Sequence, residues 1–255
     1  MSQKINLNNL NHDELVKLAD ALHVLDDRKK YNKQEFLFPE TGPYRRELYK
    51  KHMLFFEAGS IYKERALIAG NRTGKTYVSA SEMSWHLNGK YPKWWKGKKF
   101  DGPIKAWSVG KTHETTRDIL QNYLLGSKYD MGTGMVPKED IIRTTTKSGI
   151  PDAVLDVYIK HYDENGKQDG VSELTFKSYV QGVEAFMGTS VHVIQLDEEP
   201  DTRAIYDECL TRTMTTKGII ICTFTPLLGL SDVVLSFLPD GKFPNGGIGE
   251  VIRHD

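Results

Sequence analysis

The segment AGNRTGKT at residues 69–76 has the residue types and spacing of a phosphate-binding loop, with alanine in place of the usual first glycine. Such a loop points backbone N–H groups at phosphate oxygens and leads into the positive end of a helix. Gly74 lets the backbone approach a phosphate closely, Lys75 supplies a charge for the β and γ oxygens, and the Thr76 hydroxyl is a ligand for Mg²⁺. The spacing therefore predicts a site for ATP and Mg²⁺. The ATP-binding residues predicted in this loop are Gly70, Asn71, Arg72, Thr73, Gly74, Lys75 and Thr76.

A second chemical signal is the apolar stretch VHVIQLDEEP at residues 191–200, which ends in acidic residues. In P-loop enzymes with an acidic pair at a strand end, the Asp holds the Mg²⁺ shell and the following Glu polarises the attacking water. We therefore predict that Thr76 and Asp197 bind the metal and that Glu198 is the catalytic base. Glu199 is expected to face away, because successive strand residues point to opposite sides.

A hydroxyl residue, Thr225, follows the predicted strand at residues 218–224. Ligands of α/β proteins gather at the carboxyl ends of the strands, so a hydroxyl at this place can sense the γ-phosphate. An ordinary turn ended by Pro226 would give the same residues. The residues alone leave both interpretations open.

Phosphoryl transfer also needs a positive group to stabilise charge in the transition state. Three arginines are candidates: Arg72, Arg212 and Arg117. Arg72 is the leading candidate, because its place in the loop brings it near the phosphates.

The elements that position these residues alternate along the chain. Strands are expected at 66–69, 104–109, 191–196 and 218–224, and helices at 75–87, 115–125 and 204–212. This alternation predicts an α/β fold with a mainly parallel central sheet flanked by helices. The β-rich stretches 154–162 and 172–180, joined by a turn at 163–170, predict an antiparallel hairpin added to it.

The first 43 residues read as a helix followed by a linker, with a P-loop domain at 44–255. Residues 11–26 have helical periodicity, with Asn11 as N-cap and Glu14 three residues later. Its apolar stripe comprises Leu15, Leu18, Ala19, Leu22 and Leu25. We expect this stripe to pack on the domain; the alternative is a docking helix for a partner. Residues 27–43 are expected to be the linker.

The segment YPKWWKGKKF at residues 91–100 combines basic and aromatic side chains. Its lysines are candidates for contact with DNA phosphates. The favoured alternative is a solvated loop anchored by two buried tryptophans, Trp94 and Trp95. The candidate DNA contacts are Lys93, Lys96, Lys98 and Lys99.

Four stretches together resemble the ATPase half of the large terminase subunit of tailed bacteriophages, of the short-tailed-phage type. They are ERALIAGNRTGKT, HLNGKYPKWWKGKKF, FKSYVQGVEAFMGTSVHVIQLDEEP and ECLTRTMTTKGIIICTFTPLLGLSDVV, within residues 44–237. The resemblance implies a P-loop NTPase fold of the acidic-pair, additional-strand type. It also implies an ATPase motor that moves double-stranded DNA into a procapsid.

The same resemblance implies partners and roles for single residues. The partners are a portal protein, a small terminase subunit, and further copies of the chain in a ring on the procapsid. Thr225 falls in the motif that couples hydrolysis to movement, and His52 stands where relatives often carry a glutamine that recognises adenine. The chain ends where the nuclease domain of the family would begin, so no DNA cleavage is expected. Alternatives are a helicase-like or DNA-repair ATPase, or a nucleotide-gated DNA-binding module without useful turnover.

The composition is compatible with each of these functions and does not distinguish among them. Thirty-four basic and 34 acidic residues give a formal net charge of zero, so any nucleic-acid surface must be local. No apolar run reaches the roughly 18 to 20 residues of a membrane span, and the two cysteines have no metal-binding spacing. We expect a protein of the host cytoplasm, transiently at the procapsid portal, with no membrane partner.

Overall fold

A seven-stranded sheet forms the centre of the computed structural model, which describes residues 10–225, 231–244 and 249. In spatial order its strands are β1 (Glu64–Ile68), β9 (Ile219–Phe224), β8 (Val193–Asp197), β2 (Lys105–Gly110), β7 (Gln168–Ser178), β6 (Val154–Tyr162) and β5 (Ile141–Thr146). The pairs from β1 to β7 are parallel, and β6 is antiparallel to both of its neighbours. The predicted mainly parallel α/β fold is therefore confirmed.

The predicted hairpin is present, and it extends the central sheet. β7 pairs with β2 in parallel and with β6 in antiparallel fashion. Two further pieces were not predicted: β5, and a small two-stranded sheet of β3 (Gly126–Ser127) and β4 (Asp130–Met131). β5 has exposed residues at Ile142 and Arg143 in succession, so it lacks the apolar alternation that marks a half-buried strand.

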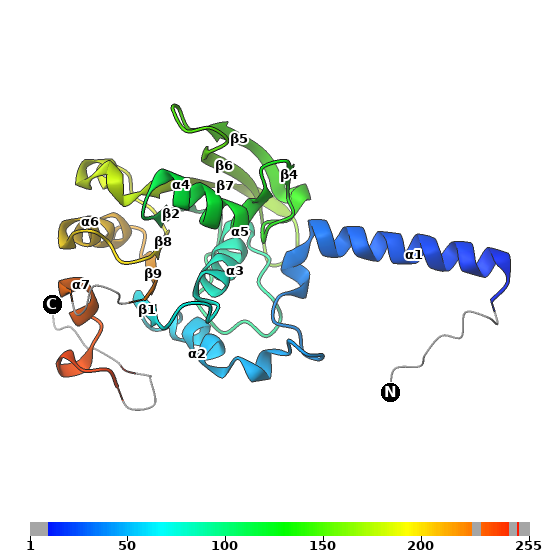
Figure 1. The fold of residues 1–255 in the computed structure, drawn as a ribbon, viewed down its shortest axis with the longest axis horizontal. Coiled ribbons are helices and arrows are strands. Elements are labelled where there is room, and N and C mark those ends of the chain that lie inside the picture. The colour runs from blue at the N-terminus through cyan, green and yellow to red at the C-terminus, as the bar shows by residue number, and fades with distance from the viewer. Residues whose placement is uncertain (1–9, 226–230, 245–248, 250–255) are drawn as a thin grey trace.

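Helices cover both faces of the sheet (Figure 1). The α-helices in the described residues are α1 (His12–Tyr31), which projects from the body, α2 (Lys50–Ala58), α3 (Lys75–Asn88), α4 (His113–Thr115), α5 (Asn122–Leu125), α6 (Arg203–Met214) and α7 (Asp232–Leu235). A π-helical segment, Thr116–Gln121, joins α4 to α5. In Figure 1, α6 and α7 lie on one side of the strands and α3 lies on the other.

Alternation along the strands divides the core into two clusters. On β9, Ile219 and Ile221 pack in the cluster of α2 and α3, whereas Ile220 and Cys222 pack in the cluster of α6 and α7. Because side chains alternate between the two faces along a strand, every second residue of each strand faces α3. The polar side chains of β8 that contact α3, Gln195 and Asp197, lie on this face.

Helix α3 is the most enclosed element, since every residue from Val78 to Asn88 is buried. Its buried charge, Glu82, accepts a 2.6 Å hydrogen bond from Arg65 of β1. Burial opposes the charge, but Arg65 and His86 hold the pKa of the Glu82 carboxyl below its usual value. This buried ion pair joins the two elements that flank the P-loop, β1 and α3.

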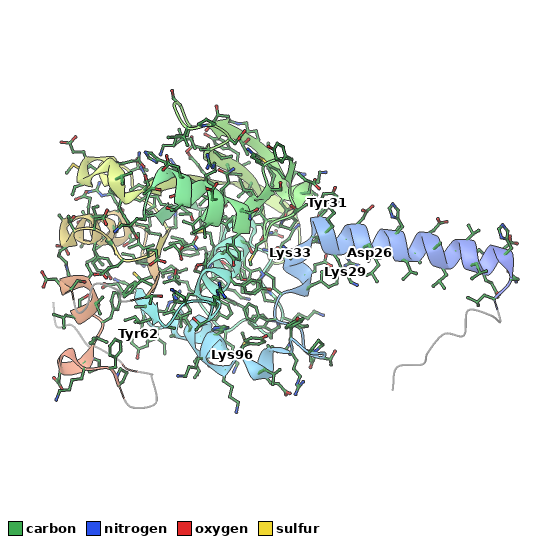
Figure 2. All side chains as sticks on the ribbon, viewed as in Figure 1. Asp26, Lys29, Tyr31, Lys33, Tyr62 and Lys96 are labelled. Carbon is green, nitrogen blue, oxygen red and sulfur yellow. The ribbon has the colours of Figure 1, made fainter. Side chains whose placement is uncertain are left out.

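The N-terminal helix has the predicted start and an unexpected position. Glu14 N donates to Asn11 Oδ1 at 3.0 Å and Asn11 N donates to Glu14 Oε2 at 2.9 Å, so the capping box is confirmed. The expected packing on the domain is wrong: α1 has no buried residue, and Leu22 is 51% exposed. Figure 1 shows α1 projecting from the body, and Figure 2 shows Tyr31 where the helix meets it. An amphipathic sequence fixes which residues share a stripe, but not what covers the stripe.

The expected linker at 27–43 is also partly wrong. Helix α1 continues to Tyr31, and Leu37 and Phe38 are buried in the core cluster of α2 and α3. The Gln34 side chain is buried too, and its amide donates to Ser84 Oγ of α3 at 3.0 Å. Apolar side chains within a Pro- and Gly-punctuated segment thus anchor it to the domain.

Within the described residues, no helix has the length and apolar character needed to cross a bilayer.

Candidate nucleotide-binding site

The P-loop lysine lies at the carboxyl edge of the sheet, the edge at which the parallel strands end. Lys75 is 8% exposed, and its Nζ donates to Ala69 O at 3.0 Å, Gly70 O at 2.8 Å and Thr225 Oγ1 at 2.9 Å. The loop between β1 and α3 is possible because Gly74, the N-cap of α3, has φ of 85°. The strand, loop and helix predicted around this lysine are confirmed.

Asp197 ends β8 beside the start of α3, as the predicted metal site requires. Its Oδ1 accepts hydrogen bonds from Thr76 Oγ1 at 3.0 Å and from Thr223 Oγ1 at 2.7 Å. Mg²⁺ in phosphate sites takes one or two protein oxygens, and phosphate oxygens and waters complete its octahedron. A hydroxyl and a carboxylate within hydrogen-bond distance of each other fit that requirement.

The carboxyl of Asp197 has an unusual electrostatic environment. The side chain is 6% exposed, and burial raises its pKa to about 6, while hydrogen bonds from Thr223 and Thr76 act in the opposite direction. A cation beside a buried carboxylate favours its charged form. The burial of Asp197 therefore suits a group whose partner is a metal ion.

Thr225 follows β9 and joins the P-loop to that strand. Its hydroxyl lies 2.9 Å from Ala69 O, 3.0 Å from Asn71 Oδ1 and 2.9 Å from the Lys75 ammonium. An ordinary turn would not require these contacts. The structure thus brings the predicted coupling residue into the P-loop, although its role stays a prediction.

Glu198 and Glu199 have different surroundings. Glu198 is exposed and has φ of 66°, the left-handed region that costs a residue with a Cβ about 1–2 kcal/mol. Its backbone is held by a bond from its N–H to Thr223 O and by a bond from Tyr179 Oη to its carbonyl, both 2.9 Å. Glu199 is half-buried and accepts a hydrogen bond from the Ser231 hydroxyl. The left-handed turn, rather than strand alternation, separates the two carboxylates.

A buried polar chain beneath the metal site was missed by sequence reasoning. Gln195 donates from Nε2 to Ser79 Oγ at 2.7 Å and accepts at Oε1 from Ser108 Oγ at 2.9 Å, and all three side chains are fully buried. Gln195 lies two residues before Asp197 on the same face of β8, and Ser79 lies one turn after Thr76 on α3. The signal was present in the sequence as a glutamine inside an otherwise apolar strand.

The three candidate arginines lie in different places. Arg72 is exposed in the P-loop with φ of 62°, and its side chain has no hydrogen bond or ion pair with another described residue. Arg212 pairs with Glu208 at 2.8 Å, and its carbonyl accepts from Val191 N at 3.0 Å, at the amino edge of the sheet. Arg212 is therefore remote from Lys75 of the same chain. Arg117 is held by Asp118 at 2.7 Å and by Pro151 O at 3.0 Å.

His52 of α2 lies beside the P-loop, where its proposed contact with a base would require it. Its Cε1 is 3.4 Å from the position that a Cβ at Gly74 would take. The ring stacks on Tyr49 with centroids 5.6 Å apart. Burial lowers the pKa of the His52 ring, although a backbone hydrogen bond with Thr73 acts to raise it. Its Nδ1 is buried without a partner among the described residues. A neutral histidine with a free ring nitrogen thus borders the loop.

The basic segment at 91–100 lies at the amino edge of the sheet, because it joins the end of α3 to the start of β2. Trp95 is 7% exposed and donates from Nε1 to Lys98 O at 2.9 Å, so its anchoring role is confirmed, whereas Trp94 is half-buried. Lys96, labelled in Figure 2 near α2, pairs with Glu57 at 3.8 Å. Contact of these lysines with DNA stays a prediction.

Comparisons with known proteins agree with this geometry. A family model described as the terminase large subunit, T4likevirus-type, N-terminal, matches residues 66–246. The large terminase subunit of Salmonella phage P22 is 38% identical over an alignment of 247 residues that covers 91% of this chain and 48% of that protein. A mutant of the ATPase domain of the Thermus phage P74-26 large terminase has a TM-score of 0.50 at 16% identity, over 70% of this chain and 65% of that chain, and shows a common fold. The chain thus spans about half the length of the P22 relative.

Proposed function

Because the chain belongs to the family of large terminase subunits, we propose that it is the ATPase motor domain of a viral DNA-packaging machine. In this proposal ATP hydrolysis drives double-stranded DNA into a procapsid. The observation that carries it is the convergence of Lys75, Thr76, Asp197 and Thr225 at one edge of the sheet. These residues come from three segments of the chain, and together they provide a phosphate charge, two metal ligands and a sensor hydroxyl.

The nucleotide ligand is ATP with Mg²⁺. The Lys75 ammonium binds the β and γ oxygens, and Thr76 and Asp197 are the protein ligands of the metal. When bound, Mg²⁺ neutralises charge on the phosphates. The buried Asp197 carboxylate and its two hydroxyl donors support this assignment.

Glu198 is the proposed catalytic base, which orients the attacking water and accepts its proton. Its exposed carboxylate, one residue beyond the metal ligand, supports this role, and the bond of Glu199 to Ser231 argues against the neighbouring carboxylate. Arg72 is proposed to stabilise charge on the transferring phosphoryl group, because it is exposed in the P-loop and has no partner among the described residues. His52 is proposed to contact the adenine.

The proposed partners follow from membership of the family. They are duplex DNA, a portal protein, a small terminase subunit, and further copies of the chain in a ring on the procapsid. The proposed place of action is the host cytoplasm, at the procapsid portal. Thr225 would couple hydrolysis to DNA movement through its contacts with the P-loop.

The test combines ATP turnover with packaging. We expect weak turnover by the free chain and faster turnover once it is assembled with portal-bearing procapsids, small subunit and duplex DNA. DNA protected from nuclease inside the procapsid measures translocation. Absence of turnover in both states would contradict the ATPase assignment. ATP-dependent strand separation without protected DNA would favour a helicase-like enzyme.

A further inference from the structure

A cavity at the carboxyl edge of the sheet is lined by basic side chains, and the nucleotide site does not use it. It lies between the helix that follows β2 and the loop at 147–153, which joins β5 to β6. Its lining contains His113, Arg117, Lys147 and Lys177 and no carboxylate. Lys177 contributes its backbone, whose carbonyl accepts a hydrogen bond from Thr116 Oγ1 at 3.2 Å. Burial lowers the pKa of the His113 ring, so the cations of this wall are Arg117 and Lys147.

The charges on this wall are incompletely compensated. Lys147 is half-buried, and its ammonium has no hydrogen bond or ion pair with any described residue. The Lys177 ammonium lies on the other face of the sheet, where it donates to Ala185 O at 2.7 Å and lies over the Trp107 ring at 4.6 Å. Burial lowers the pKa of both amines, and Lys177 lowers that of Lys147 further.

One carboxylate near the cavity compensates a charge of its wall, and the others lie apart from Lys147. Asp118 pairs with Arg117, and Asp156 raises the pKa of Lys177 but accepts hydrogen bonds from Thr145 and Thr175. Glu114, next to His113, is exposed. Lys147 is thus a partly buried charge without a counter-ion, which destabilises a fold, and an anion beside it removes that cost.

The size of the cavity limits the kind of anion. Its volume is about 10 Å³, roughly the space of one water molecule. A nucleotide does not fit, whereas a single phosphate oxygen does, with the remainder of the phosphate at the mouth. Two other polar groups of the wall already have partners: the Thr116 hydroxyl donates to Thr112 O at 2.7 Å, and His113 Nδ1 bonds with Ser178 Oγ at 2.7 Å. A phosphodiester carried past on a polymer meets this requirement.

We propose that the pocket beside Arg117 and Lys147 binds one backbone phosphate of duplex DNA. This inference rests on the proposed function, since it takes DNA as the substrate that is moved. It places the contact at the carboxyl edge, where β2 is the neighbour of β8 and its Asp197. The basic segment at 91–100 lies at the opposite edge, so the two candidate DNA contacts are distinct.

The experiment measures duplex DNA affinity by fluorescence anisotropy over a salt series for the full chain. Lys147→Met removes the charge and keeps the aliphatic stem, and Lys147→Arg keeps the charge. We expect Lys147→Met to weaken binding and to reduce the slope of log affinity against log salt by about one, and Lys147→Arg to restore most of it. Because repulsion from Lys177 is removed, the melting temperature of Lys147→Met should stay equal or rise.

The matched control is Lys167→Ala. Lys167 is exposed at the hairpin turn beyond the amino edge, so this change removes one charge far from the pocket. An unchanged salt slope in Lys147→Met, or an equal change in Lys167→Ala, overturns the proposal. A melting temperature that falls while the slope is unchanged would assign Lys147 a purely structural role, which also overturns it.

Two further measurements distinguish a failure of this proposal from a failure of the proposed function. Titration with inorganic phosphate at constant ionic strength tests a site for free anions: binding of phosphate that depends on Lys147, with DNA affinity that does not, overturns the DNA assignment. A wild-type chain that turns over ATP while its DNA affinity is insensitive to Lys147→Met leaves the ATPase assignment intact. A wild-type chain that binds no duplex DNA overturns this inference together with the proposed substrate.

Discussion

Nζ of Lys75 lies 2.9 Å from Oγ1 of Thr225, although the two residues are 150 positions apart in the chain. The bond connects the P-loop lysine with the residue that follows β9. A change in the position of either group is therefore felt by the other. Together with the bond of Thr76 to Asp197 of β8, this contact links the P-loop to the segments at the ends of two core strands.

Replacement of Thr225 by valine keeps the volume and removes the hydroxyl that contacts Lys75, Ala69 and Asn71. We expect ATP turnover to fall more than ATP affinity, because Lys75 stays but loses one of its positioning partners. Thr225→Ser keeps the hydroxyl and should retain most of the rate. Equal kcat values for the valine and serine variants would show that the hydroxyl is not used.

Replacement of Glu198 by glutamine keeps the shape and removes the basic carboxylate. ATP affinity should stay near normal, while single-turnover hydrolysis falls by about 10² to 10⁴. Glu199→Gln is the matched control, since its carboxylate bonds to Ser231, and it should affect the rate only mildly. If Glu199→Gln loses the rate while Glu198→Gln keeps it, the base has been assigned to the wrong residue.

Replacement of Asp197 by alanine removes the proposed carboxylate ligand of Mg²⁺. ATP affinity measured with Mg²⁺ should fall, whereas affinity measured with a chelator should change little. Lys75→Ala should lower affinity under both conditions and the rate as well, because its charge acts on the ground state and the transition state. Equal losses for Asp197→Ala with and without Mg²⁺ would contradict a metal-binding role.

Replacement of Gln195 by leucine removes the amide that bonds to the buried hydroxyls of Ser79 and Ser108, and among the described residues Ser79 keeps only its 3.2 Å bond to Thr76 O. The free energy of unfolding should fall by about 1–3 kcal/mol. The Mg²⁺ concentration for half-maximal nucleotide binding should rise, because the hydrogen bond of Gln195 to Ser79 holds β8 against α3. Ser172→Ala is the control, since it leaves the buried Ile104 N–H without its 3.0 Å partner. A similar loss of stability with an unchanged Mg²⁺ midpoint in both variants would reduce Gln195 to a packing residue.

Replacement of the four lysines of the basic segment by alanine tests the other candidate DNA surface. If Lys93, Lys96, Lys98 and Lys99 contact phosphates, each lost contact should lower the salt slope of DNA binding by about one. The pair of Lys96 with Glu57 is exposed, so stability should change little. An unchanged slope would leave the segment as a solvated loop anchored by Trp95.

The nucleotide site was predictable to the extent that its chemistry is local in sequence. Lys75 and Thr76 are set by one loop, and Asp197 by the end of one apolar strand, so motif and periodicity predicted their place. The contacts of Thr225 with the P-loop were less accessible, because they depend on β9 lying next to β1. The order of parallel strands is a property of the whole sheet.

Other features depended on what surrounds an element. The periodicity of α1 predicted a helix and its capping box, but packing requires a surface that accepts the stripe, and the described residues place none on it. Leu37 and Phe38 show the reverse case, in which two apolar residues anchor a segment whose composition favoured a linker. The left-handed turn at Glu198 left no signal in residue type, since glutamate rarely adopts that conformation.

The position of β1 at the end of the sheet determines when the site can form during synthesis. β1 pairs only with β9 in the described structure, so a nascent chain that has made its P-loop lacks the flanking strand. At about 5–20 residues per second, the interval before Thr225 emerges is roughly 8 to 30 s. Throughout that interval the pairing edge of β1 is open to other strands, and a chaperone that covers residues 64–68 would protect it. Nucleotide binding is therefore a late event in the maturation of the polypeptide, set by long-range pairing rather than by the loop itself.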